Sequence, residues 1–179
     1  MSQMGLFADG RSPVKPVPVV RGATISPCGV YRYRLWRTWV SEAGRVCWIM
    51  LNPSTADAVW DDPTVRRCMG FAEDWGYGGI EVVNLFAFRS TSPFELYGQA
   101  DPVGPDNNAE ILTRAQSAPR VIAAWGHHGD LLGRASQVTR WLCEHGVALD
   151  CLGLTKDGHP KHPVRLAGDT ALVPYEARA

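Results

Sequence analysis

Residues 45–51 read Arg-Val-Cys-Trp-Ile-Met-Leu, and the pair Asn52-Pro53 stops this almost uninterrupted apolar run. An apolar run of this length, without alternating polar residues, is typical of a strand buried on both faces, as strands are in parallel sheets. The stretch therefore predicts a buried strand that ends at Asn52, and other elements have to cover it from both sides.

Strand and helix patterns alternate on the C-terminal side of this run. Asp62-Pro63-Thr64 opens a predicted helix, with Asp62 as its N-cap and Pro63 at the first helical position, and the helix ends near residues 76–79. Further strands are predicted at 30–36, 80–86, 121–126 and 147–154, and further helices at 107–118 and 131–145. The spacing is that of βαβ units, which implies a mostly parallel sheet with helices on both faces.

The chain has 179 residues, which is enough for one domain with one sizeable core. Residues 1–22 hold several prolines and glycines without periodicity, so we expect a flexible N-terminal tail over 1–22 and a single α/β domain over 23–179. No run of 18 apolar residues and no basic-then-apolar leader occurs, so we expect a cytoplasmic protein that does not contact a membrane.

Charge and motifs narrow the classes of function. The formal net charge is zero, which argues against tight, sequence-blind binding of duplex DNA, because phosphate neutralisation usually needs a basic surplus. The five cysteines form no C-x-x-C pair, and no H-E-x-x-H is present, so we expect no metal. The sequence also lacks G-x-G-x-x-G, a Walker loop and G-x-S-x-G, and we expect no cofactor.

Polar residues follow each of the predicted buried strands. Parallel sheets place their ligands beyond the carboxyl ends of their strands, so we expect these loops to converge on one pocket with Asn52 at its centre. The loops are residues 52–55, 84–91, 125–128 and 155–165.

Several side chains in these loops have both a chemical and a structural interpretation. Asn52 either positions a water or bonds its own backbone before Pro53. Asn84, inside an apolar strand, is satisfied either by backbone or by the edge of a nucleobase. His162 can donate to a leaving group, whereas His127, His128 and His159 are interpreted as solvated loop residues. Trp60 either stacks on a base or covers the core.

Basic residues in or near the loops are Arg66, Arg67, Arg89, Lys161 and Arg165. Together they either contact phosphate oxygens or are ordinary surface charges. The residue types alone leave both interpretations open.

The ordered motifs resemble those of the uracil-DNA glycosylase superfamily, in particular its mismatch- and thymine-type branch. The matching segments are Leu51-Asn52-Pro53, Trp60 with Pro63 to Arg66, Asn84-Leu85 with Arg89-Ser90-Thr91, Trp125-Gly126, and the late loop His162-Pro163-Val164-Arg165-Leu166. The chain departs from the branch at Ser54, where the branch has Gly, and at Val164-Arg165, where it has Ser-Pro. Residues 28–166 are also similar to a bacterial and phage family known only as a domain of unknown function.

The glycosylase resemblance implies a three-layer α/β/α sandwich around a four-stranded, mostly parallel sheet, and cleavage of an N-glycosidic bond. Asn52 would then position the attacking water and His162 would stabilise the departing base. The remaining residues would bind substrate: Ser54, Thr55, Trp60, Asn84, Arg66, Arg89, Trp125, Arg165 and Leu166.

Three hypotheses about function stay open on the sequence alone. The first is an N-glycosylase that acts on a base in DNA or another nucleic acid. The second keeps the pocket but makes the substrate a free, modified nucleotide. The third is a module that binds a nucleotide or nucleic acid without chemistry. The oligomeric state is not predicted.

Overall fold

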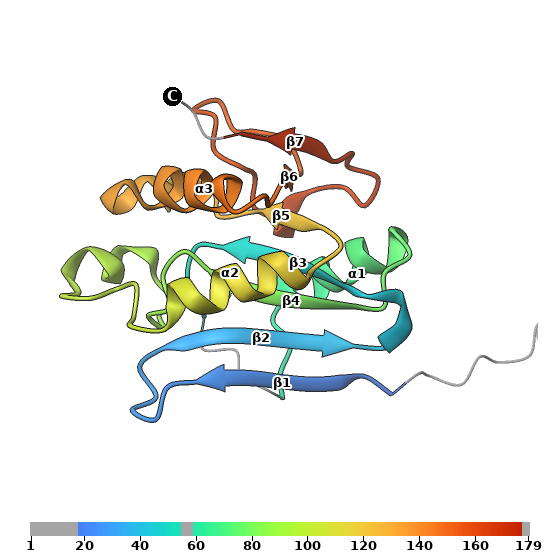
Figure 1. The fold of residues 1–179 in the computed structure, drawn as a ribbon, viewed down its shortest axis with the longest axis horizontal. Helices are drawn as coiled ribbons and strands as arrows, with labels where there is room; N and C mark the ends of the chain where they lie inside the picture. Colours follow the sequence, from blue (N-terminus) through green and yellow to red (C-terminus); the bar gives the residue numbers. More distant parts are fainter. Residues whose placement is uncertain (1–17, 55–58, 177–179) are drawn as a thin grey trace, which may run out of the picture.

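One mixed β-sheet organises the fold (Figure 1). The computed structural model of the protein describes residues 18–54 and 59–176. The sheet order in this part of the chain is β1-β2-β4-β3-β5-β6-β7. Its strands are β1 (Val20–Ile25), β2 (Arg32–Thr38), β3 (Arg45–Met50), β4 (Gly79–Asn84), β5 (Val121–Ala123), β6 (Leu149–Cys151) and β7 (Val173–Tyr175).

The four predicted apolar strands are present as the parallel block β4-β3-β5-β6. The sheet of seven strands is nevertheless larger than the four that the glycosylase resemblance implies. The three additional strands, β1, β2 and β7, pair antiparallel at the two margins of the block. Strands β2 and β7 thereby satisfy backbone N–H and C=O groups that the margins of the parallel block would otherwise leave unpaired.

The predicted N-terminal tail overlaps the sheet. Strand β1 begins at Val20, so residues 20–22 of the predicted tail pair with β2. Residues 1–17 lie outside the described residues, and the tail stays a prediction there.

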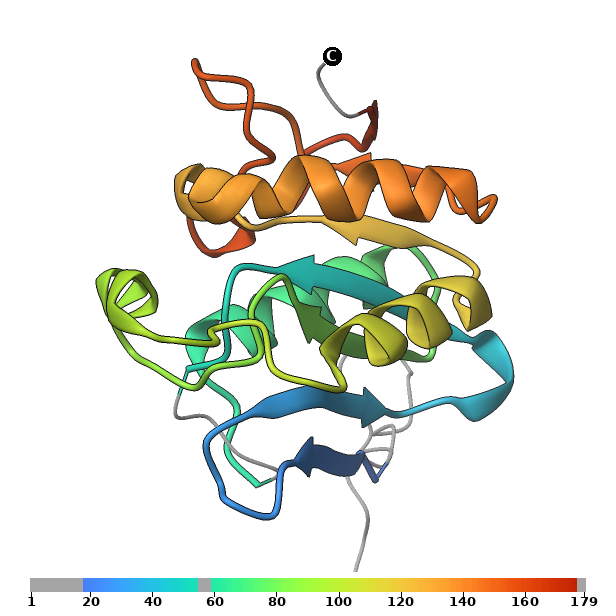
Figure 2. The ribbon, with the colours of Figure 1, turned by 60° about the vertical axis from the view of Figure 1, so that its left-hand side comes forward.

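Two hydrophobic clusters account for the two buried faces of β3. Cys47 and Ile49 belong to one cluster, together with residues of α2 (Asn107–Ser117) and α3 (Arg134–Glu144). Trp48 and Met50 belong to the other, together with residues of α1 (Pro63–Asp74). Figures 1 and 2 show α2 and α3 in front of the sheet and α1 behind it. Because successive side chains of a strand point to opposite faces, the apolar run of β3 needs both covers.

The shorter helical turns are η1 (Ser41–Ala43), η2 (Pro93–Gly98), η3 (His127–Gly133) and η4 (Pro163–Arg165). Three of them, η2, η3 and η4, follow β4, β5 and β6 in the chain and carry residues of the predicted site loops. Within the described ranges, no helix combines the length and the apolar character needed to cross a membrane.

The strand order creates a crevice beside β3. After β3 the chain passes through α1 to β4 on one side, and then through α2 to β5 on the other side of β3. Ligands of open α/β sheets bind at such a reversal, beyond the carboxyl ends of the strands.

A buried carboxylate links the sheet to α2. Glu81 of β4 is 4% exposed, and its Oε1 accepts a hydrogen bond from Arg34 Nη2 at 2.7 Å. Arg45 Nε lies 3.1 Å from the same oxygen, and Arg114 Nε of α2 lies 3.9 Å from Oε2. Three cations thus surround one buried anion, and its charge links three strands and a helix.

We expect Glu81→Gln to lower the free energy of unfolding by about 3 kcal/mol, because loss of one member of a buried charged cluster leaves the others uncompensated. Urea denaturation at neutral pH measures the change. Glu110→Gln is the matched control: Glu110 pairs with Arg114 at 3.1 Å in a more exposed position, and its loss should cost below about 1 kcal/mol. Equal losses of unfolding free energy for the two substitutions would contradict the stabilising role of the buried Glu81 cluster.

Candidate functional site

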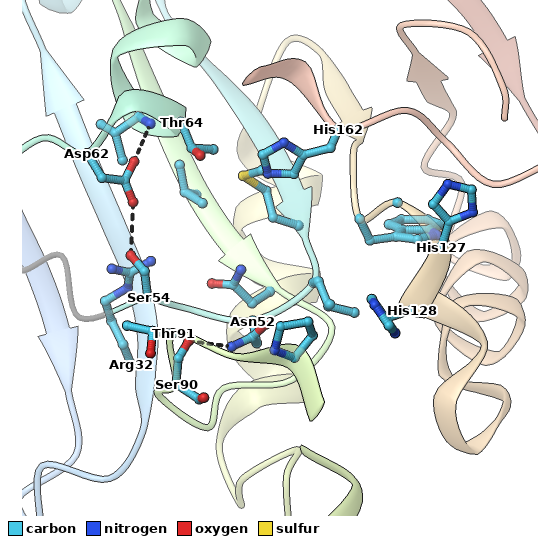
Figure 3. Close-up of a pocket in the computed structure, with 18 residues that line it drawn as sticks. Arg32, Asn52, Ser54, Asp62, Thr64, Ser90, Thr91, His127, His128 and His162 are labelled. Carbon is cyan, nitrogen blue, oxygen red and sulfur yellow. Dashed lines mark hydrogen bonds between the residues drawn. The ribbon is translucent and has the colours of Figure 1, made fainter. Parts of the chain in front are cut away.

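A cavity of about 350 Å³ opens where the chain reverses around β3 (Figure 3). Its apolar wall includes Met50, Val82 and Trp125, from the ends of the central strands. Its polar lining consists of Arg32, Asn52, Ser54, Asp62, Thr64, Asn84, Ser90, Thr91, His127, His128 and His162. A volume of this size, with an apolar wall and convergent polar groups, suits one small organic ligand.

Asn52 is held in place by one half of its amide. Its Nδ2 donates to the carbonyl of Ser90 at 2.9 Å and makes a longer contact of 3.4 Å with the carbonyl of Pro53. The backbone of Ser90 donates in turn to the Pro53 carbonyl at 2.9 Å. These bonds join the loop after β3 to the loop after β4. Since Nδ2 is committed to backbone, the amide oxygen Oδ1 is the group that Asn52 can offer to a ligand or a water.

Asn84, the last residue of β4, is only 2% exposed and lines the cavity. Its backbone carbonyl accepts from Asn107 Nδ2 at 3.0 Å, but its side-chain Oδ1 is buried without a hydrogen-bond partner among the described residues. A buried acceptor without a donor costs about 1–3 kcal/mol. A ligand that brings an N–H or O–H donor into the cavity would remove this cost.

His162 is the N-cap of η4, and its ring is fixed by the following backbone. Its Nδ1 accepts from the N–H of Val164 at 3.4 Å, which assigns the proton of the neutral ring to Nε2. Burial lowers the pKa of His162 below its ordinary value, and the nearby Asp62 carboxylate only partly opposes this shift. The imidazole is therefore a neutral donor, through Nε2–H, near physiological pH.

Asp62 combines a structural role with a place in the cavity wall. Its Oδ1 accepts from the N–H of Val65 at 2.8 Å, which confirms Asp62 as the N-cap of α1. Its Oδ2 accepts from Ser54 Oγ at 2.9 Å. Ser54 stands where the resembling glycosylases have Gly, and here its hydroxyl ties the loop after β3 to the start of α1.

Arg32 enters the cavity wall from β2 and is 4% exposed. Burial lowers the pKa of Arg32 to about 10, although the negative charge of Asp62 opposes the shift. Its guanidinium therefore stays charged at neutral pH and faces the same cavity as Asp62.

The structure brings five of the predicted site residues together. Those that line the cavity are Asn52, Ser54, Asn84, Trp125 and His162. Thr55 lies outside the described residues.

The other predicted residues lie outside the lining of the cavity. Trp60 is 75% exposed, and Arg165 is exposed on η4. Arg66 donates to the backbone of Asp61, and Arg89 donates to the carbonyl of Gly29 at 3.0 Å. Leu166 is half-buried and packs against the α1-side cluster.

Sequence reasoning missed the lining residues Arg32, Asp62 and Thr64, whereas Ser90 and His128 belong to the loops that were expected to converge on the pocket. The sequence pattern predicts Asp62 as a helix cap and Arg32 as part of an alternating strand, and it gives neither residue a place in the site. No local sequence pattern predicts that Arg32 lines the cavity, because Arg32 reaches it through the antiparallel pairing of β2 with β4.

Two histidine–carboxylate pairs join the loops after β5 and β6. His127 Nδ1 lies 3.6 Å from Asp157 Oδ2, and His159 Nε2 lies 3.3 Å from Asp130 Oδ2. Among the residues in the described ranges, no group of three or more His, Cys, Asp or Glu is arranged to hold a metal ion.

The lowered pKa of His162 predicts a loss of stability in acid. Below a pH of about 6.5 the unfolded chain binds a proton at this histidine, but the folded protein takes it up only at lower pH. Stability should therefore fall as the pH drops from 7.5 to 5.5, and His162→Gln should show a smaller fall. Urea midpoints at the two pH values test this, with exposed His145→Gln as control. A fall of the same size in His162→Gln and wild type would refute the assignment.

Comparison with known proteins adds a family but no activity. The model of a family described as "Protein of unknown function (DUF1643)" matches residues 32–164, which include β2 to β6 and every lining residue of the cavity. No curated protein and no solved structure matches the chain. Nothing in these comparisons links it to the uracil-DNA glycosylase superfamily. The match covers most of the sequence, and the chain therefore belongs to the DUF1643 family.

Proposed function

We propose that the protein hydrolyses the N-glycosidic bond of a damaged or modified nucleobase in DNA or another nucleic acid, on a three-layer, glycosylase-like framework. The observation that carries the proposal is the orientation of two side chains in one cavity. Asn52 has its Nδ2 bound to backbone, and His162 has its Nδ1 bound to backbone. Asn52 therefore offers its Oδ1 as an acceptor, and His162 offers its Nε2–H as a neutral donor.

Hydrolysis of a glycosidic bond needs both of these groups. As the C1′–N bond breaks, its electron pair moves onto the base, and positive charge develops on the sugar. His162 Nε2–H would donate to the base oxygen where negative charge builds, and a neutral donor does so without losing its own proton. Asn52 Oδ1 would hold the water that adds to C1′.

Two further lining residues would recognise the base. Asn84 would bond the edge of the base, because its buried Oδ1 needs a donor. Trp125 is 2% exposed in the cavity wall and would contribute apolar surface to a flat ring.

Residues outside the cavity would bind the nucleotides that flank the cleaved one in a nucleic acid. Arg66, Arg89 and Arg165 would contact phosphates outside the cavity, and Trp60 would stack on a neighbouring base. Among the described residues, Arg66 donates from one nitrogen to the Asp61 carbonyl and Arg89 from one nitrogen to the Gly29 carbonyl, whereas a guanidinium carries five donors. Ser54, which lines the cavity, would contact the substrate from the wall.

A free modified nucleotide is the second candidate substrate. The observation in its favour is that the arginines expected to bind phosphate do not line the cavity, whereas the buried Arg32 does. The formal net charge of zero also provides no general attraction for a polymer.

Single-turnover incubation with oligonucleotides that carry one uracil, hypoxanthine, xanthine or mismatched thymine tests the proposal, followed by alkaline cleavage of abasic sites. We expect release of one base, in single- or double-stranded substrate. Asn52→Ala should lower the rate by about 10²-fold or more, because the water loses its acceptor. Gln116→Ala, which removes an amide from the exposed face of α2, is the matched control and should retain the rate.

Salt dependence separates the two substrates. Binding to a polymer releases counterions, so its affinity should fall steeply between 50 and 200 mM salt, whereas binding of a nucleotide should fall little. If no base is released from any oligonucleotide or nucleotide, the protein is a binding module and the hydrolase proposal is wrong.

A further inference from the structure

We propose that Asp62 is the general base of this cavity: its carboxylate takes the proton of the water that Asn52 holds. The inference rests on the proposed function and adds a catalytic residue that neither the motifs nor the family comparison assigns. Among the described lining residues, Asp62 supplies the single carboxylate. It comes from the start of α1, a different element from the loop that carries Asn52.

Two hydrogen bonds orient this carboxylate. Oδ1 accepts from the N–H of Val65 at 2.8 Å, and Oδ2 accepts from Ser54 Oγ at 2.9 Å. Each carboxylate oxygen has a second lone pair, so both retain capacity to accept from a water. Figure 3 shows Asp62 and Ser54 on one side of the cavity, His162 on the other, and Asn52 lying between them lower in the view.

The environment of the Asp62 carboxylate determines whether its charge is available to a ligand. Within the part of the chain that the structure describes, no lysine or arginine forms a salt bridge with Asp62, although the charge affects both neighbours in the wall. The negative charge of Asp62 acts to raise the pKa of His162 and of Arg32, against the larger effect of burial. An anion thus faces the space in which the sugar would carry positive charge.

The proposed reaction requires a group that takes a proton from the water, and a carboxylate does this better than an amide. Asn52 can accept a hydrogen bond from water, but it is a poor acceptor of a proton. In the proposed step the water oxygen bonds to C1′, the C1′–N bond breaks, and its electron pair leaves with the base. The water proton passes to an Asp62 oxygen, and then to the departing base or to solvent. The products are the free base and the sugar hydroxyl, so atoms and charge balance.

Asp62→Asn separates catalysis from folding. Asn caps a helix as well as Asp does, and its Nδ2 can donate to Ser54 Oγ in place of the bond that Asp62 Oδ2 accepts, so the thermal midpoint should stay within a few degrees of wild type. The single-turnover rate should fall by about 10²–10⁴-fold, as for loss of a general base. Glu73→Gln, on the same helix and exposed, is the matched control and should retain both.

A binding measurement decides the role of Asp62 even if no substrate is cleaved. Two otherwise identical oligonucleotides carry either a cationic pyrrolidine or a neutral tetrahydrofuran in place of the sugar. A base that reaches the attacking water lies near C1′, so wild type should bind the cation about tenfold more tightly at low salt. Asp62→Asn should lose this preference, and Glu73→Gln should keep it.

The outcomes separate this inference from the proposed function. Base release by wild type with an Asp62→Asn rate within threefold would overturn the role of Asp62 and leave the hydrolase standing. Equal binding of the two sugar analogues by wild type would also overturn it. A preference for the cation that depends on Asp62, without base release from any substrate, would support the anionic site and refute the hydrolase.

Discussion

Strand β3 is buried on both faces, and this constraint organises the molecule. Trp48 points into the cluster covered by α1, and Ile49 points into the cluster covered by α2 and α3. To place helices on both faces, the chain leaves β3 in one direction and returns past it in the other. The crevice at the carboxyl end of β3 follows from that reversal, so the demand for burial in the core also positions the cavity.

The polar groups of the cavity are oriented by bonds that also satisfy the ends of secondary structure. Asn52 bonds the backbone of Ser90, Asp62 caps α1, and His162 caps η4. In each case one part of the side chain is committed to the backbone, and the remaining part faces the cavity in a defined orientation. Such preorganisation reduces the rearrangement that binding or a reaction requires.

The arginine that lines the cavity is not one of those expected to contact phosphate. The arginines predicted to bind phosphate lie outside the lining of the cavity. Arg32 of β2 is instead buried in the cavity wall, which also includes Asp62. The buried charge of Glu81 stabilises the fold, because Glu81 pairs with Arg34, Arg45 and Arg114 between the sheet and α2. The cavity wall therefore presents one cation, Arg32, and one anion, Asp62, together with amide and imidazole side chains.

Sequence patterns alone are sufficient to predict the parallel block, its three helices, the cap of α1 and the position of Asn52, Asn84, Trp125 and His162 around one pocket. These features depend on apolar periodicity, on Asp-Pro at a helix start and on the rule that parallel strands end at one edge, all of which are local. The three-dimensional fold is needed to show that seven strands pair, that Leu166 packs inward, and that Arg32 and Asp62 line the same cavity. Those outcomes depend on strand order and on contacts between residues far apart in the chain, and such contacts leave no periodic pattern in the sequence.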